Sequence, residues 1–132
     1  MLKLTRKTEY ALIALRHLRV VDVDKVVSTK DIAANYNIPQ PLLAKVLQEL
    51  TQSDFLEPVQ GPKGGYKLKA NLDNITMTQF FEVMEGPLGI MDCYFDSNCE
   101  LIDSCNIRAP INQLNQSMRT MFDNMTLNEV TN

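Results

Sequence analysis

The order of three helical patterns and a glycine-rich hairpin constrains the fold of this chain most. The helical patterns, with apolar side chains recurring at threes and fours, cover residues 5–21, 28–36 and 40–52. Two short strand patterns follow at residues 55–59 and 66–69, and a turn at residues 61–65 joins them. This order of elements is that of a winged helix-turn-helix domain.

Helix-boundary residues support this division. Ser28 can accept hydrogen bonds from the first free amides of the second helix. Asn37 suits a left-handed helix end, which predicts a short turn before the third helix. Pro39 and Pro41 lie at the entry of that third helix, where a missing amide donor costs little.

The second half of the chain reads as two helices separated by an irregular stretch. Residues 71–74 are interpreted as a linker, after which Thr76 can cap a helix over residues 77–85. A long helix is predicted at residues 106–123, with one further turn at residues 127–130. Between them, residues 92–105 show no periodicity, which predicts a loop.

The predicted fold class is therefore mainly α with a small β-hairpin. Residues 1–75 would form the winged helix-turn-helix domain. Residues 76–132 would add a helix, the cysteine loop and a long C-terminal dimerisation helix. A chain of 132 residues fits such a single domain with an extension.

Charge is divided unequally between the two halves. The formal net charge is −3, but residues 1–69 carry 11 Lys/Arg against 7 Asp/Glu, and residues 70–132 carry 2 against 9. The first half is thus suited to phosphates and the second is not. The chain begins without a signal-peptide pattern and has no apolar run near the ~20 residues of a membrane span. We therefore expect a cytoplasmic protein that does not bind membranes and keeps its thiols reduced.

Three groups of residues are candidates for contact with double-stranded DNA. Those on the outer face of the third helix are Gln40, Ala44, Lys45 and Gln48; those at the hairpin tip are Gln60, Pro62, Lys63, Gly64, Gly65 and Tyr66; those at the start of the first helix are Lys3, Thr5, Arg6 and Lys7. The helix can enter the major groove, the narrow tip can reach the minor groove or the phosphates, and a helix start can bind a phosphate. A winged helix that binds protein instead of DNA is the alternative.

All three cysteines lie in the loop, at Cys93, Cys99 and Cys105, each separated from the next by five residues. Three thiolates in one loop can bind a soft metal centre, such as an iron–sulfur cluster or zinc. The spacing is not the Cys-x2-Cys knuckle of structural zinc. The alternative is three unrelated thiols.

The residues quoted so far resemble the Rrf2 family of dimeric bacterial transcription regulators. The resemblance rests on segments 4–12, 61–66 and 127–130, on the three cysteines and on the long helix, and it covers nearly the whole chain. It implies that the helix at residues 106–123 crosses its partner to form a homodimer. It also implies that the cysteines hold an iron–sulfur cluster near the DNA-binding half, with a 4Fe–4S cluster favoured over a 2Fe–2S cluster.

The resemblance also bears on a fourth ligand. The branch of the family that senses cluster supply (IscR-like) has a histidine where this chain has Arg108, and arginine is not a plausible ligand. The nitric-oxide-sensing branch (NsrR-like), which the chain resembles more, uses a carboxylate from the partner's first helix. Glu9 is the matching residue here, although it could equally form an ion pair on the helix surface. His17, Asp92 and Asp103 are weaker alternatives.

The sequence thus predicts a DNA-binding transcriptional regulator, a repressor by resemblance. Its DNA affinity would depend on a cluster that senses nitric oxide, redox state or iron–sulfur supply. We do not expect an enzyme, because no nucleophile–base pair or phosphate-binding loop is found. One alternative is a cluster-free regulator whose thiols respond to oxidation. Another, of a different class, is a small iron–sulfur carrier without DNA binding.

Overall fold

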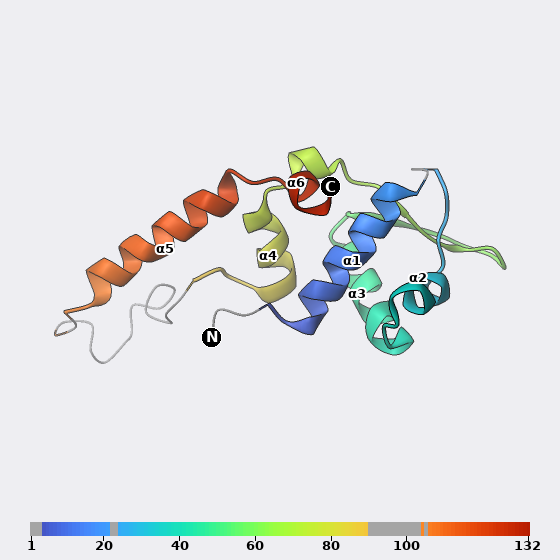
Figure 1. The fold of residues 1–132 in the computed structure, drawn as a ribbon, viewed down its shortest axis with the longest axis horizontal. Coiled ribbons are helices and arrows are strands. Elements are labelled where there is room, and N and C mark those ends of the chain that lie inside the picture. Colours follow the sequence, from blue (N-terminus) through green and yellow to red (C-terminus); the bar gives the residue numbers. More distant parts are fainter. Residues whose placement is uncertain (1–3, 22–23, 90–103, 105) are drawn as a thin grey trace.

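The computed structural model describes residues 4–21, 24–89, 104 and 106–132. The elements in chain order are α1 (Arg6–Val20), α2 (Thr29–Tyr36), α3 (Gln40–Gln52), β1 (Leu56–Val59), β2 (Gly65–Leu68), the short 3-10 helix η1 (Leu72–Asn74), α4 (Met77–Glu85), α5 (Arg108–Asp123) and α6 (Leu127–Thr131). The helices α1–α3 and the hairpin lie at one end, α5 extends away at the other, and α4 and α6 lie between them (Figure 1). The predicted fold class is confirmed.

Local capping accounts for most helix ends, as the sequence predicts. The Ser28 hydroxyl accepts a hydrogen bond from the Asp31 amide at 3.1 Å. Thr76 and Gln79 form a reciprocal capping box at the start of α4, at 3.1 and 2.9 Å. Asn37 ends α2 in the left-handed conformation, with φ 54° and ψ 45°. The turn between α2 and α3 is therefore set by the sequence next to it.

β1 begins one residue later than predicted and ends at Val59 as predicted, whereas β2 lies one residue earlier than predicted at both ends. β1 begins at Leu56 because the Phe55 amide donates to the Leu50 carbonyl at the end of α3, at 2.9 Å, and so does not join the ladder. β2 begins at Gly65, which pairs with Val59 in the antiparallel register. Val27, which precedes α2, forms an isolated antiparallel bridge with Tyr66 of β2.

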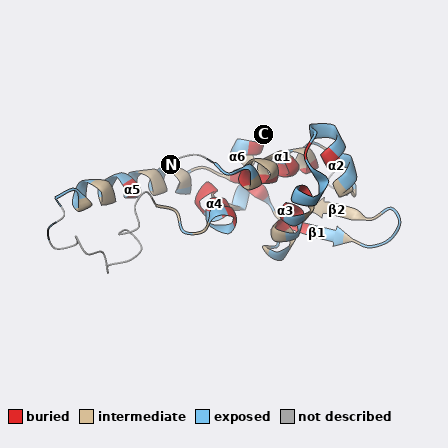
Figure 2. Ribbon diagram, turned by 90° about the horizontal axis from the view of Figure 1, so that it is seen from below, coloured by how far each residue is buried: buried red, intermediate tan, exposed pale blue. Residues whose placement is uncertain are grey.

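A single hydrophobic core joins the two halves of the chain. Its fully buried large side chains include Leu15 and Leu18 of α1, Leu43, Leu47 and Leu50 of α3, Leu56 of β1, Phe80 of α4, and Leu127 of α6. Figure 2 shows this buried material in α1, α3, α4 and α6. Each such side chain contributes about 1.5–3 kcal/mol when buried. Within residues 71–74, expected to be a linker, Leu72–Asn74 form η1 with Asn71 as its N-cap, and Leu72 is buried in the same core.

The long helix α5 begins at Arg108, two residues later than predicted, and ends at Asp123 as predicted. Near its C-terminal end it packs on α4, where Phe81 and Phe122 meet edge to face with ring centroids 5.1 Å apart. Much of its apolar side stays open, with Leu114 and Met121 about half exposed. None of the helices in the described part of the chain combines the length and apolar character needed to cross a membrane.

Candidate nucleic-acid interface

The helix α3 presents a polar face to solvent while its opposite face anchors it in the core. Gln40, Lys45 and Gln48 are exposed and Ala44 is half-buried. The buried side is made of Leu43, Val46, Leu47 and Leu50. This anchoring fixes the direction of the outer side chains, as an element inserted into a DNA groove requires. Their exposure agrees with the sequence pattern, and their contact with DNA stays a prediction.

Sequence analysis overlooked Leu42, in the first turn of α3. Its side chain is 49% exposed, beside the polar residues of the outer face. Leu42 lies about 100° around the helix from Leu43, at the edge of the buried stripe of Leu43, Val46, Leu47 and Leu50. That geometry was the signal available in the sequence. An exposed aliphatic side chain in the N-terminal turn of a groove-binding helix can contact the methyl group of thymine.

The hairpin tip is narrow because its backbone turns tightly. The Gly64 amide donates to the Gly61 carbonyl at 2.9 Å, and a Cβ atom at Gly64 would lie 2.3 Å from the Val59 carbonyl oxygen. Gln60, Pro62 and Lys63 are exposed; Gly64, Gly65 and Tyr66 are partly buried. The tip therefore offers one ammonium group on a slender loop, which suits a groove or a phosphate row.

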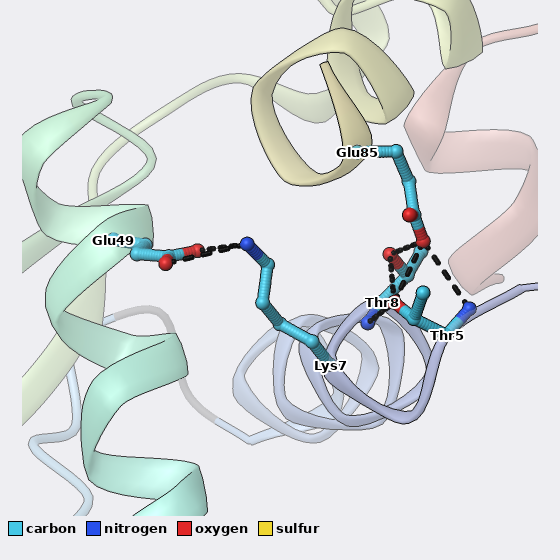
Figure 3. A network of polar contacts seen from close by, with 5 residues as sticks. All are labelled: Thr5, Lys7, Thr8, Glu49 and Glu85. Atoms are coloured by element: carbon cyan, nitrogen blue, oxygen red, sulfur yellow. Dashed lines mark hydrogen bonds and ion pairs between the residues drawn. The ribbon is translucent and has the colours of Figure 1, made fainter.

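The start of α1 is in contact with the end of α4. Glu85, the last residue of α4, brings its Oε1 atom to the Thr5 amide at 3.2 Å and to the Thr5 hydroxyl at 2.7 Å, and accepts a third hydrogen bond from the Thr8 hydroxyl (Figure 3). The candidate phosphate site at this helix start is thus next to one of the protein's own carboxylates. Sequence analysis missed Glu85 because 80 residues separate it from Thr5.

The pKa of Glu85 reflects these contacts. Burial acts to raise the pKa, but hydrogen bonds from Thr8 and Thr5 and the charge of Lys7 outweigh it, so the pKa lies below that of an ordinary glutamate. Glu85 is therefore ionised at neutral pH, and a negative charge at the start of a helix is favourable.

The basic residues at the start of α1 point in different directions. Lys7 reaches α3, where its Nζ atom lies 3.1 Å from Oε2 of Glu49 (Figure 3). Arg6 is 80% exposed and pairs with Glu9 at 2.9 Å. Lys3 lies outside the described residues. Of the two predicted basic residues that the structure describes here, Arg6 extends further into solvent than Lys7, whose side chain is 42% exposed.

The proposed metal ligands are only partly within the described structure. Cys93, Cys99 and Cys105 lie outside it. Glu9 lies in the first turn of α1 and forms the ion pair with Arg6 that sequence analysis raised as the alternative. His17 contacts the Tyr36 hydroxyl through Nδ1 at 2.7 Å. Within residues 4–21, 24–89, 104 and 106–132, no three His, Cys, Asp or Glu side chains gather as a metal site would require.

Comparisons of the sequence extend these observations to known proteins. Residues 4–132 match the model of the Rrf2 family, described as an iron-dependent transcriptional regulator. The chain is 28% identical over 128 residues to the HTH-type transcriptional regulator NsrR of Geobacillus kaustophilus (strain HTA426), covering 96% of this chain and 87% of the relative. It is 27% identical over 132 residues to NsrR of Bacillus subtilis (strain 168), covering 98% and 90%.

Comparisons of the structure give the same fold. CymR (YrzC), the global cysteine regulator of B. subtilis, aligns with a TM-score of 0.77 at 23% identity, covering 99% of this chain and 97% of CymR. IscR of T. potens aligns with a TM-score of 0.71 at 23% identity, covering 96% and 83%. At these identities the likeness establishes the arrangement of helices and hairpin.

Proposed function

Because the chain belongs to the Rrf2 family of transcriptional regulators and is not an enzyme, we propose that it is a homodimeric DNA-binding repressor controlled by an iron–sulfur cluster. The observation that carries the DNA-binding part is the rigid anchoring of α3, whose outer face stays polar and exposed. Gln40, Lys45 and Gln48 would read base edges in the major groove, since glutamine pairs with adenine and lysine with guanine.

The wing adds contacts that do not depend on sequence. Lys63 at the exposed tip would meet phosphates or enter the minor groove, and Arg6 at the start of α1 would meet the backbone beside it. Each phosphate neutralised makes binding more sensitive to salt. Two copies in a dimer would double these contacts. This would compensate for the modest positive charge of residues 1–69 in a single chain.

The homodimer is proposed from the unpartnered side of α5. Leu114 and Met121 of α5, and Ile107 immediately before it, are each about half exposed, and α5 extends away from the core (Figures 1 and 2). A second copy of the same helix is the partner that the family resemblance implies. Packing two such faces would bury apolar surface at both copies by one symmetric contact.

The cluster is proposed from its donor set. Three thiolates, from Cys93, Cys99 and Cys105, suit iron–sulfur binding, and Arg108 excludes the histidine ligand of the cluster-supply branch. Glu9 of the partner subunit is proposed as the fourth ligand, because it lies on the outer side of α1 with its side chain 37% exposed. The cluster, 4Fe–4S in preference to 2Fe–2S, would supply a centre that nitric oxide, oxidants or iron shortage alter.

The residues of this chain would transmit that change. A ligand bond at Glu9 would restrain α1, which packs against α3. Losing the bond would leave Glu9 to its pairing with Arg6, a weak and exposed interaction. To move DNA from mostly bound to mostly free takes roughly 5 kcal/mol of differential affinity.

Iron and sulfide analysis of anaerobically purified protein tests the proposal, with absorption spectra before and after nitric oxide. Wild type should be coloured and should respond, and Glu9→Ala should alter both spectrum and response. Lys30→Ala, on the exposed start of α2, is the control. Iron-free protein whose DNA affinity follows thiol oxidation would favour the cluster-free regulator. Iron–sulfur protein without salt-sensitive DNA binding would favour the carrier.

A further inference from the structure

Two separate polar contacts hold the beginning of α1, one to Glu85 of α4 and the other, through Lys7, to Glu49 of α3. We infer that Glu85 is a positioning residue for DNA binding: its carboxylate fixes the start of α1, and α1 holds the DNA-reading helix through Lys7 and Glu49 (Figure 3). The inference rests on the DNA-binding part of the proposed function. It does not require a cluster to be bound.

The first contact joins α4 to α1. One oxygen of Glu85 accepts hydrogen bonds from the Thr5 amide, the Thr5 hydroxyl and the Thr8 hydroxyl. Thr8 is fully buried, so its hydroxyl cannot turn to water if Glu85 is lost. Hydrogen bonds to a charged acceptor are the stronger kind. The arrangement therefore determines where the first turn of α1 lies relative to α4.

The second contact joins α1 to α3. The Lys7 side chain points away from Glu85 and extends to Glu49 in the second half of α3 (Figure 3). α1 also packs directly against both α3 and α4. A shift of the first turn of α1 would thus move a helix that is bonded and packed to the DNA-reading helix. Small displacements there matter, because hydrogen bonds to base edges require close alignment.

Glu82 supplies a matched comparison on the same helix. It lies one turn before Glu85 in α4 and pairs with Arg119 of α5 at 3.0 Å. Both glutamates join α4 to another helix by polar contacts of similar length. The partner of Glu82 belongs to neither α1 nor α3. If such contacts only stabilised the fold, replacing either glutamate would change DNA affinity by the same amount.

The test compares Glu85→Gln with Glu82→Gln in the full-length dimer. A DNA site is first selected from a random-sequence duplex library with wild type, and affinities are measured by fluorescence anisotropy at several salt concentrations, well below each melting temperature. We expect about a tenfold loss for Glu85→Gln, the size of one charged hydrogen bond, with an unchanged salt slope because no phosphate contact is removed. Glu82→Gln should stay within about twofold of wild type.

A second variant covers the case in which Glu85→Gln folds poorly. Thr8→Ala removes one donor and leaves both Thr5 contacts, so it should lose about threefold in affinity. Amide hydrogen exchange should show faster exchange in α3 for both variants. Equal DNA affinities for Glu85→Gln, Thr8→Ala and Glu82→Gln would overturn the positioning role. A wild type without salt-sensitive DNA binding would instead overturn the proposed function.

Discussion

Replacing Gly65 by alanine should detach the wing from the segment that precedes α2. A Cβ atom at Gly65 would lie 2.3 Å from the Val27 carbonyl oxygen, a backbone atom that cannot swing aside. Val27 and Tyr66 exchange two backbone hydrogen bonds at this point, of 2.9 and 2.8 Å. Relief of the clash must separate these strands, so both bonds are weakened together.

The expected cost follows from those two bonds. At about 1 kcal/mol net for each, the loss is about 2 kcal/mol, and the lower entropy of the unfolded alanine chain returns about 0.5 kcal/mol of it. For a chain of this length that corresponds to a fall in melting temperature of roughly 6 °C. The selected DNA site should also bind more weakly, because the wing carrying Lys63 loses its support.

Thermal unfolding and amide hydrogen exchange of the two variants Gly65→Ala and Gly61→Ala measure the effect. Gly61 is a matched control: it has a positive φ of 110°, but no atom lies within 4 Å of its added Cβ. Gly61→Ala should therefore be strained by its own backbone alone and should leave the Val27 and Tyr66 amides protected. If Gly65→Ala kept both amides as protected as in wild type, the reasoning from close backbone approach would be refuted.

Three further predictions concern other parts of the molecule. Glu85 has a lowered pKa, to which the charge of Lys7 contributes. Its stabilisation is therefore full above the ordinary glutamate pKa and is lost as pH falls through the lowered value. Wild type should accordingly show a steeper acid unfolding curve than Glu85→Gln. Leu42→Ala should abolish a roughly fourfold preference for thymine over deoxyuridine in the selected site; equal preference in both proteins would exclude the methyl contact. Leu114→Asp should convert the dimer to monomer in sedimentation, and an unchanged dimer would exclude this face of α5.

Features determined by neighbouring residues could be predicted from the sequence. The ends of α2 and α4 depend on Ser28, Asn37 and Thr76, each of which acts within three or four residues of its own position. The hairpin was predictable for the same reason, since alternation and a glycine-rich turn are local patterns. Its strand limits were not, because the Phe55 amide is taken by Leu50 at the end of the preceding helix.

The candidate interface was predictable as a surface but not as a set of contacts. Periodicity separated the outer side chains of α3 from its buried stripe, and the same pattern contains the Leu42–Leu43 step that was overlooked. The contact between Glu85 and Thr5 has no local signature, since it depends on how α4 packs beside α1. From the sequence alone, a charged residue at a helix end is expected to be solvated.

That contact changes which groups at the start of α1 are suited to DNA. A phosphate placed against the Thr5 amide would approach the Glu85 carboxylate, and like charges a few ångströms apart repel each other. Glu49 is likewise held by Lys7, so that ammonium group is already neutralised. Among the described DNA candidates, the cations left for phosphates are therefore the exposed Lys45 and Lys63, together with Arg6, whose pairing with Glu9 is exposed and weak. Removing any one of these three should lower the salt slope by about one unit, whereas removing Lys7 should lower affinity with little change in slope.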